Sequence, residues 1–498
     1  MKTRFLLLFV AITLGSSVMA ATIKVTSNEP IGTGSLKEAV DAATDGDIIV
    51  FEFQAPNNDI LLDDEIDMKS ITINGTNTVN GLKVVLKQTV SGKKVFDLAA
   101  GVSASISNLI FDGSAGSSYP NITAVVGSTL NIDNCIFRNI DSGTNNGSAA
   151  RLQGVANVTN CLFENNTCSG SYGGPALCIY NAADITVDNC SFVGNSSTGA
   201  PNRGGGAIVV RGTVDDPVNV KITNSTFVNN LSTNTGGAIL ASVQSSVDRP
   251  LNLTVVNCTF AGNQGDGAIS TLVTVKGTVK VYLVNSIVVN NVNAAGSEYS
   301  DLLESLGASA DPTASVLIEP HNVIYSVASE TIVTADRNCI KVADPSTADI
   351  FKELETFATD KYRPILSNTN GQTVAMISSS SIAKNAGVSI LPGYTIPLLD
   401  QLGATRPAIP AIGAVEFKDL SSGVPATISG NKITVKVDNR EISVLGITKP
   451  TTIEVYSLMG SLLKKSVVNN NGTISMQGFQ GNIFILKIED QNFKVFLR

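Results

Sequence analysis

The chain has 498 residues and a formal net charge of -8, with 43% hydrophobic and only 15% charged residues. This composition excludes a disordered chain. An acidic surface repels phosphate backbones, so the sequence predicts no nucleic-acid partner. The chain contains 43 Gly but no Trp. A composition rich in small residues favours stacked strands, so we expect an all-β protein.

Residues 1–20 have the pattern of a secretory signal peptide. Lys2 and Arg4 precede the apolar run LLLFVAITLG, and Val18-Met19-Ala20 supplies small residues for cleavage after Ala20. This run is shorter than the roughly 20 apolar residues that a membrane helix needs. The sequence therefore predicts Sec-type export to the periplasm and no transmembrane segment.

A short motif centred on Asn repeats at spacings of 26 residues (Asn108 to Asn134) to 35 residues (Asn189 to Asn224). In the copy at Asn189, alternation places Val187 inside before the Asn and Cys190 inside after it. A period of two that resets at one residue indicates a strand, a sharp bend and a second strand. Asn suits the bend because it tolerates the left-handed conformation. Seven copies share this pattern, at Asn108, Asn134, Asn160, Asn189, Asn224, Asn257 and Asn285.

Fixed bends joined by loops of variable length predict a solenoid, and we expect a right-handed parallel β-helix over residues 21–417. Stacked turns would align Asn134, Asn160 and Asn189 so that their amides bond along the axis. Aromatic rings would form an interior column, because parallel strands lie about 4.8 Å apart. The residues of this column are Phe111, Phe137, Phe163, Phe192, Phe227 and Phe260.

The position after the bend Asn is a slot for a small buried side chain, which Ser225 and Ser286 also fill. Equivalent side chains one strand apart are farther apart than a disulfide allows, so we expect unbonded thiols in this slot. Cys168 and Cys178 fall outside it and are the pair best placed for a disulfide, although the sequence does not decide whether they form one. The slot holds Cys135, Cys161, Cys190 and Cys258.

Phe-x-x-Asn followed by Gly-Gly-Ala-Ile, as from Phe227 to Leu240, resembles the repeats of polymorphic outer membrane proteins. That resemblance implies a surface β-helix with an adhesive role. VTSNEPIGTGSLKEAVDAATDGDIIVF from Val25 resembles the opening cap of secreted β-helix proteins called choice-of-anchor Q proteins. SIAKNAG at Ser381 and DQLGATRPAIPAIGAVEF at Asp400 resemble the closing stretch of the same group.

Residues 418–425 form a Ser/Gly/Pro linker, and residues 426–498 read as the alternating strands of a small β-sandwich. This tail resembles the C-terminal sorting domain of the type IX secretion system, although Phe484 stands where Tyr is more usual. The resemblance implies a Bacteroidota source, the secretion machinery as partner, and a protein that is released or attached to the outer cell surface. The matching residues include Tyr456, Gly460, Gly481, Lys494 and Arg498.

The chain offers few charges for chemistry. Lyases and glycosidases need clustered charged groups on adjacent turns, and the sequence suggests no catalytic residue, no metal site and no cofactor other than Ca²⁺. The sole histidine, His321, is expected to be structural. Two acidic stretches at matching offsets are the best binding candidates, either as a stacked cluster for a cation or sugar or as solvated loops. Their residues are Asp215, Asp216, Asp248 and Arg249.

These observations predict a non-catalytic, adhesin-like binding protein for a polysaccharide or for a host or matrix surface. The alternative is a polysaccharide lyase or glycoside hydrolase that acts outside the cell.

Overall fold

A computed structural model describes residues 20–496 except for a set of short stretches and the segment before the terminal unit. The stretches not described are 55–57, 117, 200–203, 214–216, 245–249, 327–336, 343–348, 359, 370, 418–433, 439–440, 446–449, 458–461, 469–471, 477–482 and 489–490. The chain divides into two compact units, one ending at Phe417 and the other starting at Lys418. Each unit is described on its own below.

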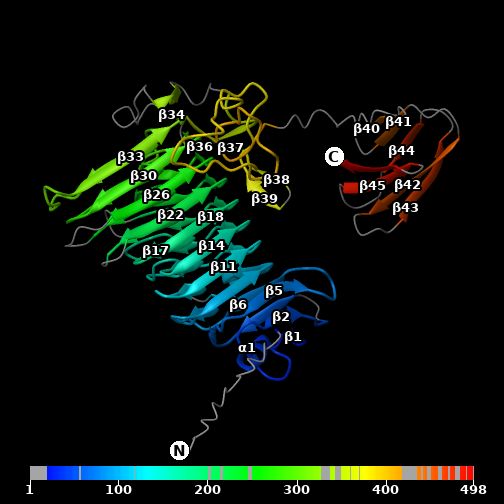
Figure 1. Cartoon of the computed structure of the whole chain (residues 1–498), viewed down its shortest axis with the longest axis horizontal. Helices are drawn as coiled ribbons and strands as arrows, with labels where there is room; N and C mark the ends of the chain where they lie inside the picture. Colours follow the sequence, from blue (N-terminus) through cyan, green and yellow to red (C-terminus); the bar gives the residue numbers. More distant parts are fainter. Residues whose placement is uncertain are drawn as a thin grey trace, which may run out of the picture. The chain divides into compact units, whose positions relative to one another are not determined.

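The first unit is a parallel β-solenoid of about nine turns, which confirms the predicted stacking of strands. Its strands follow one another in chain order from β1 to β34 along the stack (Figure 1). Sheet A contains β1 (Thr22–Val25), β2 (Ile48–Phe51), β5 (Thr72–Asn77), β8 (Ser103–Ser107), β11 (Thr129–Asp133), β14 (Val155–Thr159), β18 (Asp184–Asp188), β22 (Val218–Thr223), β26 (Pro250–Val256), β30 (Thr278–Val284) and β33 (Ser315–His321).

Two further long sheets complete the walls, and all their strand pairs are parallel. Sheet B contains β3 (Asp59–Leu62), β6 (Val84–Gln88), β9 (Leu109–Asp112), β12 (Ile136–Arg138), β15 (Leu162–Glu164), β19 (Ser191–Val193), β23 (Thr226–Val228), β27 (Thr259–Ala261), β31 (Ile287–Val289), β34 (Ile324–Ser326) and β35 (Ile340–Val342). Sheet C contains β4 (Ile66–Asp67), β7 (Phe96–Leu98), β10 (Ile122–Ala124), β13 (Ala150–Leu152), β17 (Leu177–Tyr180), β21 (Ile208–Gly212), β25 (Ile239–Val243), β29 (Ile269–Val273) and β32 (Leu302–Leu306).

Between sheets B and C runs a short parallel sheet that contains β16 (Thr167–Cys168), β20 (Ser196–Ser197), β24 (Leu231–Thr235) and β28 (Gln264–Asp266). The other named elements of the unit are α1 (Leu36–Ala42), the 3-10 turn η1 (Gly113–Ala115), and two antiparallel hairpins, β36 (Leu354–Ala358) with β37 (Lys361–Pro364) and β38 (Ser367–Thr369) with β39 (Gln372–Val374). Helix α1 lies at the N-terminal end of the stack beside β1 and β2 (Figure 1) and buries Leu36, Ala39 and Val40.

All seven predicted bend residues have the left-handed backbone, with φ between 45° and 59°, so this prediction is confirmed. The amide ladder predicted along them is only partly correct. Asn134 Nδ2 donates to Asn108 Oδ1 at 2.7 Å, and Asn189 Nδ2 lies 3.5 Å from Asn160 Oδ1. Asn160 Nδ2 instead donates to the carboxylate of Asp133 at 2.7 Å, because a charged acceptor stands beside the bend and competes with the amide.

The predicted column of Phe rings is confirmed and fully buried. From Phe111 to Phe260 the ring centroids of successive turns lie 4.4–4.9 Å apart, with interplanar angles of 2–8°. This spacing equals that of the parallel strands, so the register of the backbone imposes the ring stack.

The four thiols of the slot after the bend are free and buried, as expected. Cys190 N donates to Ser225 Oγ at 3.1 Å, and Cys135 N lies 3.4 Å from Cys161 Sγ. Either a Ser hydroxyl or a Cys thiol can therefore accept from the backbone N–H of the neighbouring turn. Cys168 and Cys178, whose pairing the sequence left open, are both free thiols. Cys168 belongs to β16, whereas Cys178 lies on β17 in an apolar cluster with Val209.

From Phe163 to Phe260, a second left-handed position lies two residues after each Phe, and the next side chain points inward as an asparagine. In this interior asparagine ladder, the Nδ2 of each of the first four members donates to the Oδ1 of the next member at 2.8–2.9 Å. All five members also donate to a Phe carbonyl at 2.9–3.1 Å. The first four turns of the ladder are therefore held by the same pair of bonds. The ladder consists of Asn166, Asn195, Asn230, Asn263 and Asn291.

The buried carboxylate of Asp301 ends this ladder. It accepts from Asn291 Nδ2 at 2.9 Å and from Ser326 N at 2.7 Å, and Ser326 Oγ also donates to it. Burial raises the pKa of Asp301 to about 6, and these hydrogen bonds oppose the rise. At neutral pH the group is therefore mainly ionised, which is the form that accepts all three bonds.

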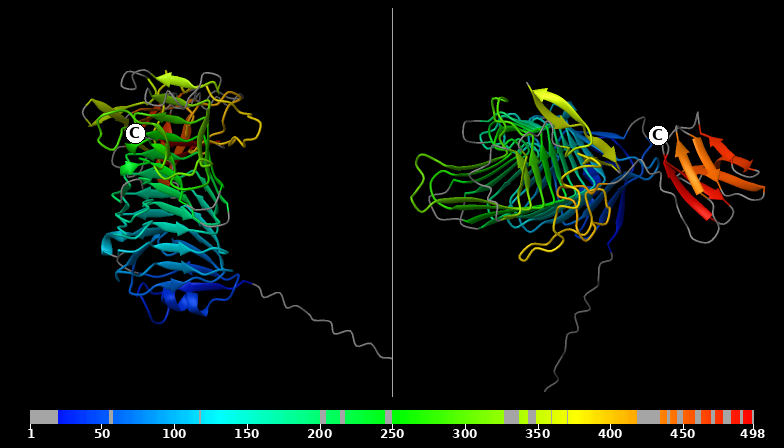
Figure 2. Two further views of the ribbon diagram at one scale, coloured as in Figure 1. Left: turned by 90° about the vertical axis from the view of Figure 1, so that its left-hand side faces the viewer. Right: turned by 90° about the horizontal axis from the view of Figure 1, so that it is seen from above.

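The closing segment, residues 372–417, packs along the outer side of sheet B (Figure 2). Gln401 Nε2 donates to Cys190 O at 3.0 Å, and Thr226 Oγ1 donates to Gln401 Oε1 at 2.6 Å. The buried ion pair between Arg406 and Glu416 has an N–O distance of 2.6 Å, and Arg406 also donates to Asn224 Oδ1 at 2.9 Å. The segment thus covers polar side chains of the solenoid that would otherwise face water.

The second unit consists of two small antiparallel sheets with their own buried core, which includes Ile453, Val455 and Leu486. Their strands are β40 (Thr434–Asp438), β41 (Glu441–Leu445), β44 (Gly472–Ser475), β42 (Thr451–Ser457), β43 (Leu462–Val468), β45 (Ile483–Ile488) and β46 (Gln491–Phe496). Among the proposed sorting residues, Tyr456 lies on β42 and Lys494 within β46, while Gly460, Gly481 and Arg498 lie outside the described residues.

Candidate functional site

The four binding candidates of the sequence lie outside the described residues, so their stacking stays a prediction. The strands that precede them, β21 and β25, pair in parallel with Gly212 opposite Val243. These two strands therefore end at neighbouring positions of sheet C. Within the part of the chain that the structure describes, no group of three or more His, Cys, Asp or Glu could hold a metal ion.

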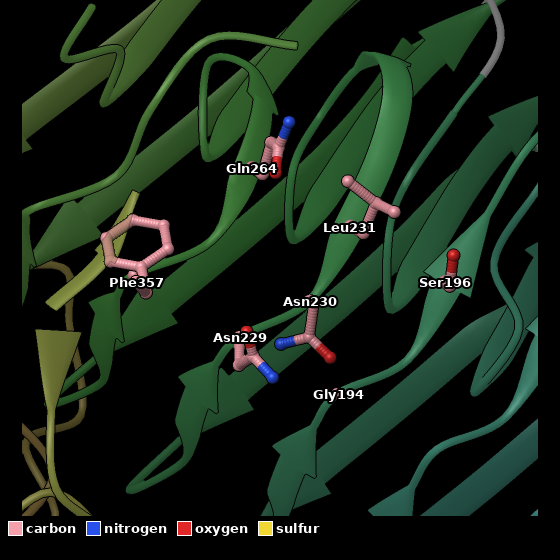
Figure 3. A pocket seen from close by; sticks show the side chains of 8 residues that line it. Gly194, Ser196, Asn229, Asn230, Leu231, Gln264 and Phe357 are labelled. Carbon is pink, nitrogen blue, oxygen red and sulfur yellow. The ribbon is translucent and has the colours of Figure 1, made fainter. Parts of the chain in front are cut away.

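A pocket of about 250 Å³ lies where the outer side of the solenoid meets strand β36. Figure 3 shows the ring of Phe357 on one side and Leu231 and Ser196 on the other, with Gln264 and Asn229 between them. The remaining lining residues are Gly194, Asn230 and Gly262. The volume is near the lower end for ligand pockets, about 300 Å³, and suits one small ring-shaped group.

Two glycines of this pocket stand where no side chain would fit. The second left-handed position is Gly194 and Gly262 on the turns that flank Asn229, with φ of 66° for Gly194, 64° for Gly262 and 59° for Asn229. A Cβ at Gly262 would lie 2.3 Å from Arg363 Cβ, and one at Gly194 would lie 2.6 Å from Asn165 Oδ1. Glycine at both positions therefore lets Arg363 and Asn165 lie close to these turns, while the side chain of Asn229 between them is exposed.

The β36–β37 hairpin forms one wall of the pocket through Phe357, and Arg363 holds the hairpin in place. Arg363 Nε donates to Glu355 Oε1 at 2.7 Å, and its guanidinium lies 5.7 Å from the ring centroid of Phe357. Arg363 Nη1 also donates to Asn229 Oδ1 on the solenoid. The guanidinium thus fixes the hairpin against the turn. Because Asn229 Oδ1 accepts this hydrogen bond, the guanidinium also orients the amide of Asn229.

The lining combines one aromatic face with amide and hydroxyl groups. An aromatic ring packs against the apolar face of a sugar, while amides and hydroxyls exchange hydrogen bonds with its hydroxyl groups. Gln264 Nε2 donates to Ala294 O at 2.8 Å, which holds that side chain in place. The arrangement fits a neutral sugar ring better than an ion, because none of the eight described lining residues is charged and the nearby Arg363 is paired with Glu355.

Sequence reasoning missed this pocket. Phe357 comes from a hairpin more than ninety residues after Gln264 in the chain, and no local pattern links the two. The alternation of Asn and Gly after the Phe column was the available signal, since it marks turns that other segments can approach closely.

The outer face of sheet C carries a cluster of arginine and tyrosine side chains that the sequence also did not reveal. Arg151 Nη2 donates to the hydroxyl of Tyr180 at 2.9 Å. The guanidinium of Arg211 lies 3.3 Å from the ring centroid of Tyr172 and donates to Gln244 Oε1 at 2.6 Å.

His321 has more partners than the sequence suggested. Its Nε2 lies 3.1 Å from Arg337 Nη1 and 3.7 Å from Glu319 Oε1, and Arg337 donates to Glu319. The ring centroids of His321 and Tyr394 lie 6.0 Å apart. The guanidinium of Arg337 is the largest cause that lowers the pKa of Glu319. This carboxylate is therefore held ionised and already compensated, which suits fixing the closing segment better than proton transfer.

Comparisons with known proteins assign no family to the chain. No family model matches the chain, and no curated protein matches it. Among solved structures, one titled "Geobacillus virus E2 - ORF18" aligns at 10% identity over 90% of this chain and 86% of that chain, with a TM-score of 0.29. This score is too low to assign a common fold, so the class, a parallel β-solenoid, rests on the strand pairing itself. The described residues contain no helix long and apolar enough to span a membrane.

Proposed function

We propose that this chain is a secreted or cell-surface binding protein, adhesin-like and non-catalytic, whose ligand is a saccharide of an extracellular polysaccharide or of a host or matrix surface. The observation that carries the proposal is the pocket between Phe357 and Asn229, with its single aromatic wall and amide lining. The solenoid is a right-handed β-helix of the kind that the repeat and cap motifs resemble. A rigid stack of parallel strands presents such a pocket without the need for a moving part.

Polysaccharide cleavage is the alternative function. His321 and Glu319 supply a base and a carboxylate within 3.7 Å, which favours it. The ion pair between Glu319 and Arg337 weighs against it, because a compensated carboxylate is a poor proton acceptor. The acidic stretches at Asp215 and Asp248 would serve the same alternative if they held Ca²⁺ against a uronate.

The pocket is tested by measuring retention of the purified full chain on an array of neutral and acidic glycans. We expect a neutral sugar to be retained, and Phe357→Ala to weaken its affinity at least about tenfold because the aromatic wall is lost. Asn229→Gly removes the amide without backbone strain, since glycine holds the same position on both flanking turns, and should also weaken it.

Tyr362→Ala is the matched control, because it removes an aromatic ring from the same hairpin outside the pocket. Equal loss for Tyr362→Ala and Phe357→Ala, or no retained glycan, would contradict a sugar site at this position.

The second unit is proposed to be a β-sandwich that serves as the sorting signal of a type IX secretion system. Its separate core, its position behind a linker and the resemblance of residues 451–498 support this role. In a Bacteroidota host that has this system, deletion of residues 426–498 should leave the solenoid in the periplasm. Immunodetection on intact cells measures the outcome, and surface display that is unchanged by the deletion would refute the proposal.

A further inference from the structure

A second binding surface lies on the outer face of sheet C, which is a different wall from the sugar pocket. Tyr180 on β17 is the direct cross-strand partner of Arg211 on β21. Arg151 on β13 is the partner of Cys178 on β17. The two arginines therefore stand two strands apart, about 10 Å at the backbone, on one flat parallel sheet.

Both guanidinium groups are half-buried and held rigidly. Arg151 lies over the ring of Tyr180, 5.6 Å from its centroid, and donates to its hydroxyl. Gln153 Nε2 donates to the same hydroxyl at 2.8 Å. Arg151 Nε is buried and has no hydrogen-bond partner among the described residues, so the positive charge of this group is incompletely compensated by the protein.

An apolar strip lies beneath these side chains. It is formed by Cys178, Val209, Leu240 and Leu272, all at most 5% exposed. Positive charge above a desolvated strip interacts with an anion more strongly than at an open surface, because the local dielectric constant is lower. Burial raises the pKa of the Cys178 thiol, and the positive charges of Arg151 and Arg211 each oppose that rise. Both arginines therefore lie close enough to affect this residue of the strip electrostatically.

We propose that this surface, formed by Arg151, Tyr172, Tyr180 and Arg211, binds a carboxylated polysaccharide of the polyuronate class. Guanidinium groups match carboxylates in a forked geometry, and two of them at fixed separation engage two acidic groups of one chain. The rings of Tyr172 and Tyr180 hold the guanidinium groups of Arg211 and Arg151 in fixed positions. The protein carries a net charge of -8, so it must hold an anionic polymer through local positive groups such as these two.

The test measures binding of the full chain to polygalacturonate and to the same polymer with its carboxylates methyl-esterified. We expect binding to polygalacturonate alone, with affinity that falls as salt is raised. Arg151→Gln should weaken it at least about tenfold, as expected for loss of a charge-assisted contact. Tyr172→Ala should weaken it as well.

Lys221→Gln is the matched control, since it removes one positive charge from the outer face of sheet A. Phe357→Ala should leave polygalacturonate binding unchanged, which separates this surface from the neutral-sugar pocket. Circular dichroism and thermal unfolding establish that each variant folds. Equal weakening by Arg151→Gln and Lys221→Gln, equal binding of the esterified polymer, or absence of binding would overturn the proposal.

Discussion

Replacing Asn230 by Leu should destabilise the solenoid by about 4–6 kcal/mol, since buried groups left without a hydrogen-bond partner cost about 1–3 kcal/mol each. Asn230 donates to Phe192 O and Asn263 Oδ1, both at 2.9 Å, and accepts from Asn195 N and Nδ2 at 3.1 and 2.9 Å. Leu has a similar shape, but its side chain makes none of these bonds; only Asn263 Oδ1 stays satisfied, by the backbone N–H of residue 230 at 3.0 Å. The midpoint of denaturant unfolding measures the effect.

Asn229→Gly is the matched control, because it removes the same kind of side chain one position earlier, where Asn229 is exposed. Its change in stability should stay within about 1 kcal/mol, as glycine accepts a positive φ readily. Similar losses for the two variants would mean that the interior asparagine ladder does not hold the turns together.

Replacing Arg406 by Leu should cost about 3–5 kcal/mol, because it leaves the buried carboxylate of Glu416 without its cation. The two side chains are only 3% and 9% exposed, and Arg406 also donates to Gly413 O at 3.2 Å and Ala414 O at 3.1 Å. Thermal unfolding and limited proteolysis of the closing segment measure the loss.

The double variant Arg406→Leu with Glu416→Gln should be more stable than Arg406→Leu alone, because no unpaired charge stays buried. Lys24→Leu is the surface control. Lys24 and Glu52 are 58% and 43% exposed, so loss of that pair should cost less than about 1 kcal/mol. A double variant that is less stable than the single variant would contradict an ion-pair role for Arg406.

The sequence allowed prediction of the regular part of the solenoid because each turn obeys one local rule. Asn189 and its counterparts reset the strand phase, and Phe192 and its counterparts then point inward. The interior role of Asn195 and Asn230 escaped this reasoning, although the Phe-x-x-Asn pattern was visible. A polar residue is expected outside, and only the second left-handed position before it turns its side chain into the core.

The candidate sites were less predictable because they join segments that lie far apart in the chain. Arg363 bonds to Asn229 and Gln401 bonds to Cys190, and such contacts leave no local period in the sequence. Arg151 and Arg211 likewise become neighbours on one sheet only when turns of unequal length are stacked in register.

A cleavage assay distinguishes a binding protein from an enzyme. A polysaccharide that the full chain retains is incubated with the protein, with and without Ca²⁺, while unsaturated product absorbance and new reducing ends are followed. We expect a bound and intact polymer under both conditions. Product that forms with the native chain and disappears in the variants Asp215→Ala with Asp248→Ala, or in His321→Ala, would contradict it and make the chain an enzyme.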